Sequence, residues 1–246
     1  MRNIVLDPEC IENNRVVVEG DLCHYLKDVR RIREGSRIDA VIGRKLYSLV
    51  VSRILKGKIV FGVEHTRDVR DKCVPISVYQ GLLKSKKMDL AVSKLGEIGV
   101  GNFFPLKTER SIPEINLEGE KLVRWRRLAR EGAKISGIED VMRVHDPIRF
   151  SDVGRILGRA KRGTILLFST REPGHHLKSF LDTLDRDGAA CFHLFFGPEG
   201  GFSDDEVNAI IEGGGVPITM GDFIMKAETA SIIGAGFIRI FYSEKG

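Results

Sequence analysis

Two loops near the end of the chain combine glycine with charged side chains, a composition that suits a small-molecule site. The first follows the apolar run 191–196 and reads Gly197-Pro198-Glu199-Gly200-Gly201-Phe202-Ser203. Its glycines can adopt positive φ and let a ligand lie against bare backbone. The second loop, 220–230, follows a predicted strand at 216–220. We interpret the two loops as one ligand site, although the first alone is equally typical of a tight strand-to-helix turn.

The helix predicted after the first loop has an acidic start. Ser203 fits an N-cap and Glu206 its capping-box partner, while Asp204 and Asp205 fall in the first turn. Carboxylates at this position suit the helix dipole. They also disfavour a phosphate, which is the usual ligand of such a helix end. We therefore expect a neutral or cationic ligand.

Together the two loops resemble those of the SPOUT methyltransferases, and within them the RsmE family of ribosomal-RNA uridine-N3 methyltransferases. The first loop matches the family's GPEGGF(S)xxE pattern through Glu206. The second is similar to LGxxILRxETA, but it has Met220 and Met225 for leucine and Lys226 for arginine. Lysine keeps the charge of arginine and loses its bidentate fork.

The resemblance implies an enzyme that transfers a methyl group from S-adenosylmethionine to N3 of a specific uridine in small-subunit (16S) ribosomal RNA. It also implies a homodimer with the cofactor pocket near the subunit interface. Lys226 is a candidate for stabilising negative charge on a uridine carbonyl, and Glu199 for accepting a proton or a hydrogen bond. Either residue could instead hold its loop. The cofactor-binding residues implied are Gly197, Pro198, Glu199, Gly200, Gly201, Met220, Gly221, Ile224, Met225, Lys226 and Thr229.

Departures from the family pattern leave other functions open. Near the end of a basic helix predicted at 117–136, the family has EAxxQSGR, where this chain has Ile135 and Ile138 for the glutamine and the arginine. With Lys226, these changes favour a non-catalytic RNA-binding ribosome assembly factor. The intact glycine loop favours an enzyme instead, since RNA binding alone does not need it. A SPOUT methyltransferase that acts on transfer RNA is a third alternative.

A further block, 82–105, resembles the family's LLKGxRMDxxIxKxTELGVxxIxP stretch. Within it, Met88, Ala91, Val92 and Leu95 have helical spacing, and the glycines after 98 end the helix. The basic residues 84–87 are typical of a solvated helix start, but beside a methyltransferase site they could also contact the substrate.

The N-terminal segment is basic and predicted to be mostly β. Residues 24–58 hold ten Lys/Arg and three Asp/Glu, a net charge of +7 in a chain whose total is +5. Such a module is typical of phosphate-backbone binding, although a solvated basic face is the common alternative. The stretch 24–35 also resembles the family's PUA-like RNA-binding domain. The candidate RNA contacts are His24, Arg30, Arg31 and Arg33.

The spacing of apolar residues predicts two domains. In the first, residues 1–72, Leu22, Tyr25, Leu26 and Val29 predict a helix capped by Asp21. Strands are predicted there at 36–40, 46–55 and 58–63, with a hairpin at Gly57 and a linker at 67–72. The second, residues 73–246, alternates strands with helices, which favours a mostly parallel α/β sheet. The resemblance alone implies a small β-barrel for the first domain and a trefoil-knotted SPOUT fold for the second. In the second domain, strands are predicted at 76–83, 103–106, 164–168, 191–196 and 216–220, and helices at 117–136, 151–160 and 227–242.

Composition excludes several classes of protein. No apolar stretch approaches the length needed to span a bilayer, and no secretion signal opens the sequence. The four cysteines lie far apart without a CxxC pair, which argues against zinc or disulfides and fits a reducing cytosol. We expect a cytoplasmic protein with neither a membrane nor a metal partner. His175-His176 is predicted at the surface and Trp125 in the core.

Overall fold

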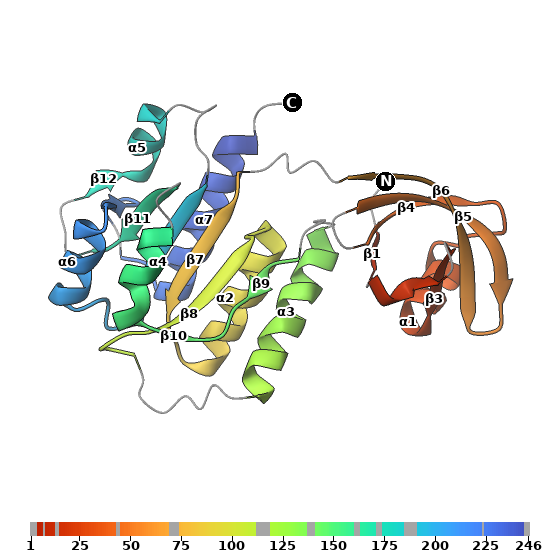
Figure 1. Ribbon diagram of the computed structural model, residues 1–246, viewed down its shortest axis with the longest axis horizontal. Coiled ribbons are helices and arrows are strands. Elements are labelled where there is room, and N and C mark those ends of the chain that lie inside the picture. The colour runs from red at the N-terminus through yellow and green to blue at the C-terminus, as the bar shows by residue number, and fades with distance from the viewer. Residues whose placement is uncertain are drawn as a thin grey trace. The chain divides into compact units, whose positions relative to one another are not determined.

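Figure 1 shows the computed structural model of the chain. The structure describes residues 4–6, 8–12, 15–42, 45–68, 74–111, 119–136, 141–159, 163–170, 174–184, 191–222 and 224–243. These residues divide into two compact units, a small one that ends at Asp68 and a large one that begins at Val74.

The small unit is a six-stranded sheet with a short helix against it. Its strand order is β1-β4-β5-β6-β3-β2, and all neighbours are antiparallel except β1 and β4. Its core is aliphatic around Phe61, Leu49 and Leu26, all fully buried. The elements are β1 Ile4–Leu6, η1 Pro8–Cys10, β2 Ile11–Glu12, β3 Arg15–Glu19, α1 Gly20–His24, β4 Arg37–Ile42, β5 Lys45–Leu55 and β6 Lys58–Asp68.

The helical segment of the small unit differs from the sequence prediction. Helix α1 begins at Gly20 with Glu19 as its N-cap, so the predicted cap Asp21 lies in the first turn. A π-helical turn, η2, follows at Tyr25–Val29. Of the four residues predicted on one apolar face, Leu26 is fully buried and Leu22 partly buried, whereas Tyr25 and Val29 are exposed.

The hairpin between β5 and β6 is confirmed. Gly57 turns it with a φ of +82°, in the left-handed region that glycine adopts without strain. Strand β6 is longer than predicted and runs to Asp68, so it includes the start of the segment predicted as a linker. Residues 69–72 of that segment lie outside the described residues.

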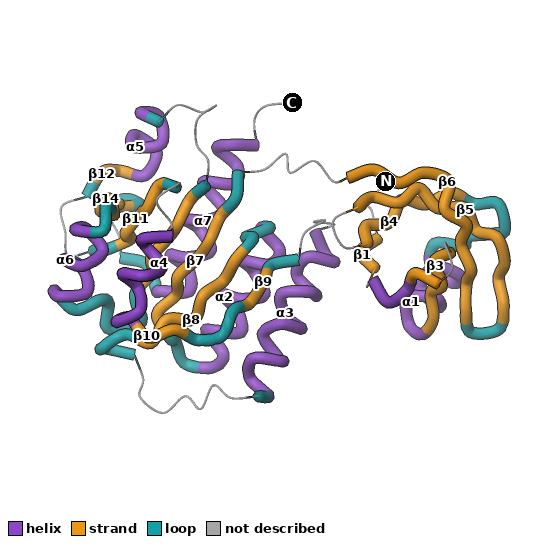
Figure 2. The backbone as a smooth tube through the Cα atoms, viewed as in Figure 1, coloured by secondary structure: helices purple, strands orange, loops and turns teal. Residues whose placement is uncertain are grey.

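The large unit is a parallel sheet with helices on both faces (Figure 2). Its strands are β7 Ile76–Gly81, β8 Asn102–Lys107, β9 Arg143–Val144, β10 Ile148–Arg149, β11 Thr164–Phe168, β12 His175–His176, β13 Phe192–Phe196 and β14 Gly215–Thr219. Its helices are α2 Ser85–Ile98, α3 Glu120–Ser136, η3 Phe150–Asp152, α4 Val153–Arg159, α5 Leu177–Thr183, α6 Asp204–Glu212 and α7 Ala227–Ser243.

The strand order of the large sheet places β13 and β14, the strands before the two glycine-bearing loops, on either side of β11. The order is β10-β8-β7-β13-β11-β14-β12, with β9 beside β8, and every pairing among the described strands is parallel. Phe196 pairs with Phe168 on one side and Gln80 on the other, and Phe168 also pairs with Ile218. The carboxyl ends of these four strands therefore align, which is where α/β sheets bind ligands. The predicted parallel α/β sheet is confirmed.

Close helix packing depends on glycine at particular positions. A Cβ on Gly234 of α7 would lie 3.0 Å from the ζ carbon of Phe196, so the small residue lets this helix lie directly on the sheet. A Cβ on Gly96 of α2 would lie 2.7 Å from the Ala129 carbonyl oxygen on α3, and one on Gly132 of α3 would lie 2.4 Å from that of Ser93. Helix α7 therefore packs directly against the sheet.

Two predicted helices begin later than the sequence pattern indicated. Ser151, at the predicted start of the helix 151–160, lies in the 3-10 turn η3, and α4 begins at Val153. Helix α3 begins at Glu120, three residues after the predicted start. Trp125 of this helix is buried, as predicted, and its Nε1 donates to Asp89 Oδ1 at 3.1 Å. Ala160 and Ile138 lie outside the described residues.

Within the described ranges, no helix combines the length and the apolar character needed to cross a membrane. Nor do three or more His, Cys, Asp or Glu side chains gather there in a way that could hold a metal ion. His175 and His176 are both exposed on β12.

Candidate functional site

A pocket of about 480 Å³ lies at the carboxyl ends of β11 and β13. Its size is typical of a small-molecule site. Four segments form it: the loop after β11, the glycine loop after β13, the first turn of α2, and the residues that lead into α7. The lining residues are Lys87, Phe168, Ser169, Thr170, Phe196, Gly197, Pro198, Glu199, Gly200, Gly201, Phe202, Ile224, Met225, Lys226, Ala227 and Ala230.

The glycine loop after β13 folds into a tight turn on itself. The Gly201 N–H donates to the Pro198 carbonyl oxygen at 2.9 Å, and Gly201 has a φ of +71°. A Cβ on Gly197 would lie 3.0 Å from the backbone of Gly201, a tight contact that glycine avoids. The loop then enters α6 through the predicted capping box, in which the Ser203 N–H donates to Glu206 Oε2 at 3.0 Å.

The end of β7 contacts the glycine loop and fixes its position. The buried amide of Gln80 donates to the carbonyl oxygen of Gly197 at 3.0 Å through Nε2. Gly81 lies directly against Pro198, because a Cβ on Gly81 would be only 2.4 Å from the proline nitrogen. The position of the loop relative to the sheet is therefore set by two adjacent residues more than a hundred positions earlier in the chain.

The turn after β8 also contacts this loop through hydrogen bonds. Arg110 donates through Nη1 to the carbonyl oxygens of Phe202 at 2.9 Å and Gly200 at 3.4 Å. The neighbouring Glu109 N–H donates to Glu206 Oε1 at 2.8 Å, so the buried carboxylate joins this turn to the start of α6. A Cβ on Gly200 would lie 3.3 Å from the Arg110 Cβ, which places this glycine against the arginine stem.

An ion pair joins α2 to the glycine loop at the pocket wall. Lys87 Nζ lies 3.0 Å from Glu199 Oε1, and the Lys84 N–H donates to the same oxygen at 3.5 Å. Partial burial acts to raise the pKa of Glu199, but hydrogen bonds from Lys87 and from backbone N–H groups outweigh it, and the pKa lies below its usual value. The hydrogen bond to Glu199 raises the pKa of Lys87. Both groups are therefore charged at neutral pH.

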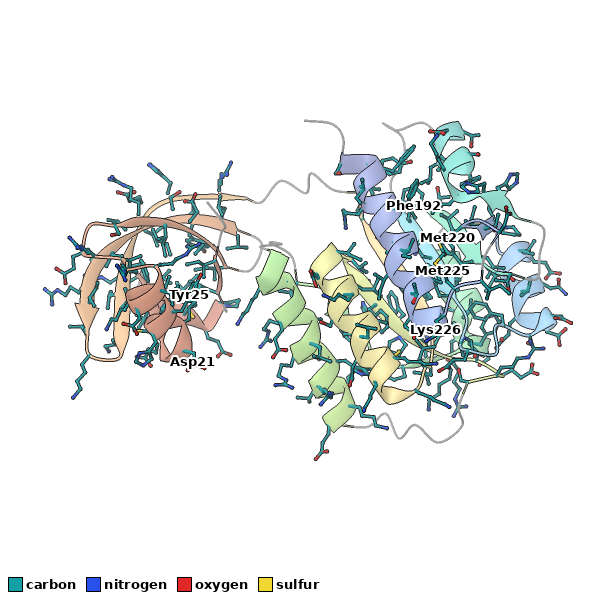
Figure 3. The ribbon with its side chains drawn as sticks, turned by 180° about the vertical axis from the view of Figure 1, so that it is seen from behind. Asp21, Tyr25, Phe192, Met220, Met225 and Lys226 are labelled. Atoms are coloured by element: carbon teal, nitrogen blue, oxygen red, sulfur yellow. The ribbon has the colours of Figure 1, made fainter. Side chains whose placement is uncertain are left out.

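The second loop reaches the pocket just before α7. Thr219 Oγ1, at the end of β14, donates to the Gly221 carbonyl oxygen at 3.2 Å and fixes the turn out of the strand. Gly221 has a φ of +130°, a conformation that favours glycine. Met225 and Lys226 line the pocket beside the first turn of α7, where Figure 3 labels them. The Lys226 carbonyl oxygen accepts from the Ala230 N–H at 2.8 Å and starts that helix.

The structure brings most of the predicted cofactor residues together. Met220 is partly buried against the core of the sheet, so it is not a wall of the pocket. Gly221 and Thr229 are also not among the lining residues, whereas Ala230 is, so cofactor contacts by Met220, Gly221 and Thr229 stay predictions. The predicted residues that line the pocket are Gly197, Pro198, Glu199, Gly200, Gly201, Ile224, Met225 and Lys226.

Several site residues could not be assigned from the sequence. Ser169 and Thr170 carried only a general signal, because they follow a predicted strand of an α/β sheet. Lys87 stood in a basic run that is equally typical of a solvated helix. Arg110 gave no signal, because it acts on backbone carbonyl oxygens that have no sequence pattern.

The candidate RNA contacts belong to the small unit. His24, Arg31 and Arg33 are exposed and Arg30 is partly buried. The His24 ring lies 3.7 Å from the Asp28 carboxylate on the same helical segment. Exposure of this kind permits a phosphate contact and also fits a solvated basic face, so the assignment stays a prediction.

Comparison with known proteins shows the class of this chain. Residues 70–239 match the RNA methyltransferase domain family, and the chain belongs to that family. It is 24% identical over 243 residues to the ribosomal RNA small subunit methyltransferase E 2 of Borreliella burgdorferi, with 97% of each chain covered. It is 27% identical over 227 residues to the ribosomal RNA small subunit methyltransferase E of Aquifex aeolicus, covering 89% of this chain and 91% of that one.

A solved structure shares the fold over nearly the whole chain. It is the ribosomal RNA small subunit methyltransferase E of Neisseria gonorrhoeae, bound to S-adenosyl methionine. The TM-score is 0.77 at 22% identity, and 98% of both chains is covered.

Proposed function

We propose that this protein transfers the methyl group of S-adenosylmethionine to N3 of a specific uridine in small-subunit (16S) ribosomal RNA. The observation that carries the proposal is the pocket that Gly197–Gly201 and Ile224–Lys226 form together at aligned strand ends. This chain belongs to the RNA methyltransferase domain family, and both named relatives are small-subunit rRNA methyltransferases. Those names favour 16S rRNA over transfer RNA, and an enzyme over an assembly factor.

The chemistry of the pocket fits S-adenosylmethionine. When bound, this cofactor supplies a methyl group on a positively charged sulfur. Phe168, Phe202 and Met225 give apolar wall, and the glycine loop offers open backbone for an adenosyl group. The ionised Glu199 carboxylate suits a cationic ligand. We place the cofactor against Gly197–Gly201 and Ile224–Lys226.

Two lysines are placed to act on the uridine. Methylation at N3 removes a proton and leaves negative charge on the neighbouring carbonyl oxygens, so fixed cations beside the base favour the reaction. Lys226 is exposed at the pocket and keeps the positive charge of the family's arginine. Lys87 also lines the pocket and is held there by Glu199. We assign both lysines to charge stabilisation.

Glu199 is better suited to anchoring than to proton transfer. Its pKa is lowered by its hydrogen bonds, and a carboxylate with a low pKa is a weak base at neutral pH. Its contacts with Lys87 and the Lys84 N–H instead tie the glycine loop to α2. We therefore propose that Glu199 positions Lys87 and the loop. Its role as a proton acceptor stays a prediction.

The small unit is proposed to be a PUA-like RNA-binding domain, residues 1–72, ahead of a SPOUT domain, residues 73–246. Its mainly antiparallel sheet supports the first assignment, and its net positive charge supports RNA binding through phosphate contacts. His24, Arg30, Arg31 and Arg33 are the proposed contacts. Work on ribosomal RNA would place the protein in the cytoplasm.

A homodimer and a trefoil knot complete the proposal. The outer face of α7 exposes Ile233, Phe237 and Ile240, an apolar stripe next to the helix start that carries the pocket. A second copy of the chain would cover this stripe and bring the interface close to the cofactor. The knot is implied by the family resemblance, and the strand order, in which β13 lies between β7 and β11, is compatible with it.

A methyl-transfer assay tests the proposal. Small ribosomal subunits are purified from cells that lack the gene and incubated with the protein and S-adenosylmethionine labelled in its methyl group. We expect label in the rRNA as 3-methyluridine, and none when subunits from gene-carrying cells are used. A protein that binds both the cofactor and the subunit but transfers no label would support the assembly-factor alternative instead.

A further inference from the structure

The small unit exposes two apolar side chains that the sequence pattern would bury. Tyr25 is 45% exposed and Val29 is 67% exposed, although both share helical spacing with the buried Leu26. They are four residues apart on the same turn, so they form one continuous apolar patch. Single exposed apolar residues are ordinary, whereas contiguous exposed apolar surface rimmed by polar residues is a mark of interaction sites. Figure 3 labels Tyr25 on this helical segment.

The backbone around the patch is unusual in two ways. Tyr25–Val29 is a π-helical turn, a rare form that is frequently found at functional sites. Arg31, two residues later, has a φ of +52°, which is strained for a residue other than glycine. Hydrogen bonds hold both features in place, from the Arg30 N–H to the Tyr25 carbonyl oxygen and from the Ile32 N–H to that of Leu26, each at 3.1 Å. The patch is therefore presented by a fixed backbone.

Cations border the patch on two sides. Arg31 and Arg33 follow it in the chain and are exposed. Lys27 Nζ donates to the Leu55 carbonyl oxygen at 2.5 Å, which brings the tip of the β5–β6 hairpin, with the exposed Lys56, against the same helical segment. The patch thus combines an aromatic ring on an apolar floor with positive charge at its edge.

The charges on the helix itself restrict what can bind. Asp21 and Asp28 are exposed on the same segment, and they would repel a phosphate placed directly over Tyr25. A neutral, flat group fits over the ring, while its phosphates fit beside Arg31 and Arg33. An unpaired nucleotide has this distribution of charge, and single-stranded RNA is bound by aromatic stacking combined with nearby cations.

We propose that Tyr25 and Val29 form a stacking platform for an unpaired base of RNA, with the flanking phosphates held by Arg31 and Arg33. The proposal rests on RNA being the substrate and adds that the small unit prefers unpaired RNA to a duplex. Tyr25 supplies the ring, Val29 extends the apolar floor, and the π-helical turn presents both. The bound base is distinct from the uridine in the pocket.

The test compares the binding of two RNA probes to the full-length protein. One is a single-stranded oligouridylate, and the other is a perfectly paired RNA duplex of the same length. Base stacking on an aromatic residue is worth about 1–3 kcal/mol, so Tyr25→Ala should weaken binding of the single strand by about 5-fold to 150-fold. Tyr25→Phe should bind as the parent does, because the ring is kept. Val123→Ala, at a 64% exposed valine of the large unit, is a control that should bind both probes as the parent does.

The salt dependence separates stacking from ionic contact. Tyr25→Ala removes no charge, so the slope of log affinity against log salt should equal that of the parent, and duplex binding should be unchanged. Equal losses on both probes, a reduced slope, or parental affinity in a folded Tyr25→Ala protein would each overturn the stacking platform. Failure of the parent protein to bind either RNA would instead overturn RNA binding by the proposed enzyme.

Discussion

Replacing Gly81 with alanine should displace the glycine loop and weaken cofactor binding. The added Cβ would lie 2.4 Å from the Pro198 nitrogen and 2.8 Å from the Gly197 carbonyl carbon. Because nonbonded carbon atoms pack at about 3.5–4.0 Å, the loop has to move by about 1 Å. Overpacking of this kind costs about 1–3 kcal/mol, and misplacement by 1 Å can cost about 10²-fold in rate. We expect the Kd for S-adenosylmethionine to rise by about tenfold or more.

Calorimetric titration measures that Kd, and thermal unfolding of the same samples reports the free energy of unfolding. Gly101→Ala is the matched control, because its Cβ would meet the Ile76 carbonyl oxygen at 3.6 Å, an ordinary contact. The control should bind the cofactor as the parent does. A folded Gly81→Ala protein with parental affinity would refute the reasoning, since the loop would then tolerate a large displacement without losing its ligand.

Three further predictions concern the glycine loop, the pocket lysine and the basic segment of the small unit. Arg110→Ala should raise the Kd for S-adenosylmethionine by about tenfold in calorimetry, since it removes a charged hydrogen bond to the Phe202 carbonyl oxygen that orients the loop; an unchanged Kd would show that the turn after β8 does not position the loop. Lys226→Met should slow single-turnover methyl transfer by about 10²-fold, while Lys226→Arg keeps activity; a parental rate in Lys226→Met would remove its electrostatic role. Changing Arg30, Arg31 and Arg33 together to alanine should lower the slope of log affinity against log salt by up to about 3 in an RNA-binding titration, with cofactor affinity unchanged. A parental slope would show that these three arginines form only a solvated basic face.

The glycine loop was predictable because its signals are local. The strand end, the tight turn and the acidic helix start all lie within twelve consecutive residues, and Ser203 and Glu206 form the predicted capping box. The parallel sheet followed from the alternation of apolar strands with helical spacing. These features depend on neighbours in sequence, which a single chain displays directly.

The supports of the loop were not predictable, because they join distant parts of the chain. Lys87 and Glu199 are 112 positions apart, and the contact between Gly81 and Pro198 appears only when β7 pairs with β13. Arg110 binds carbonyl oxygens, which every residue has. No local pattern records such contacts.

The positions of Met220 and Thr229 relative to the pocket were not predictable. Met220 and Thr229 belong to the matching motif, but a motif does not say which of its residues face the ligand. The end of β14 turns Met220 toward the core, and Ala230 instead of Thr229 faces the pocket from the first turn of α7. In the small unit, the helical spacing of Leu22, Tyr25, Leu26 and Val29 predicted a helix, but spacing alone did not show that its second half is a π-helical turn with Tyr25 and Val29 exposed.

The central claim is that this pocket supports methylation of uridine N3 in 16S rRNA, and one measurement tests it most directly. Nucleosides from the small-subunit rRNA of cells lacking the gene are analysed by mass spectrometry, with the deletion complemented by the parent gene or by Lys226→Met. We predict that one 3-methyluridine disappears in the deletion, returns with the parent gene, and stays strongly reduced with Lys226→Met. An rRNA that keeps its full content of 3-methyluridine in the deletion would contradict the account.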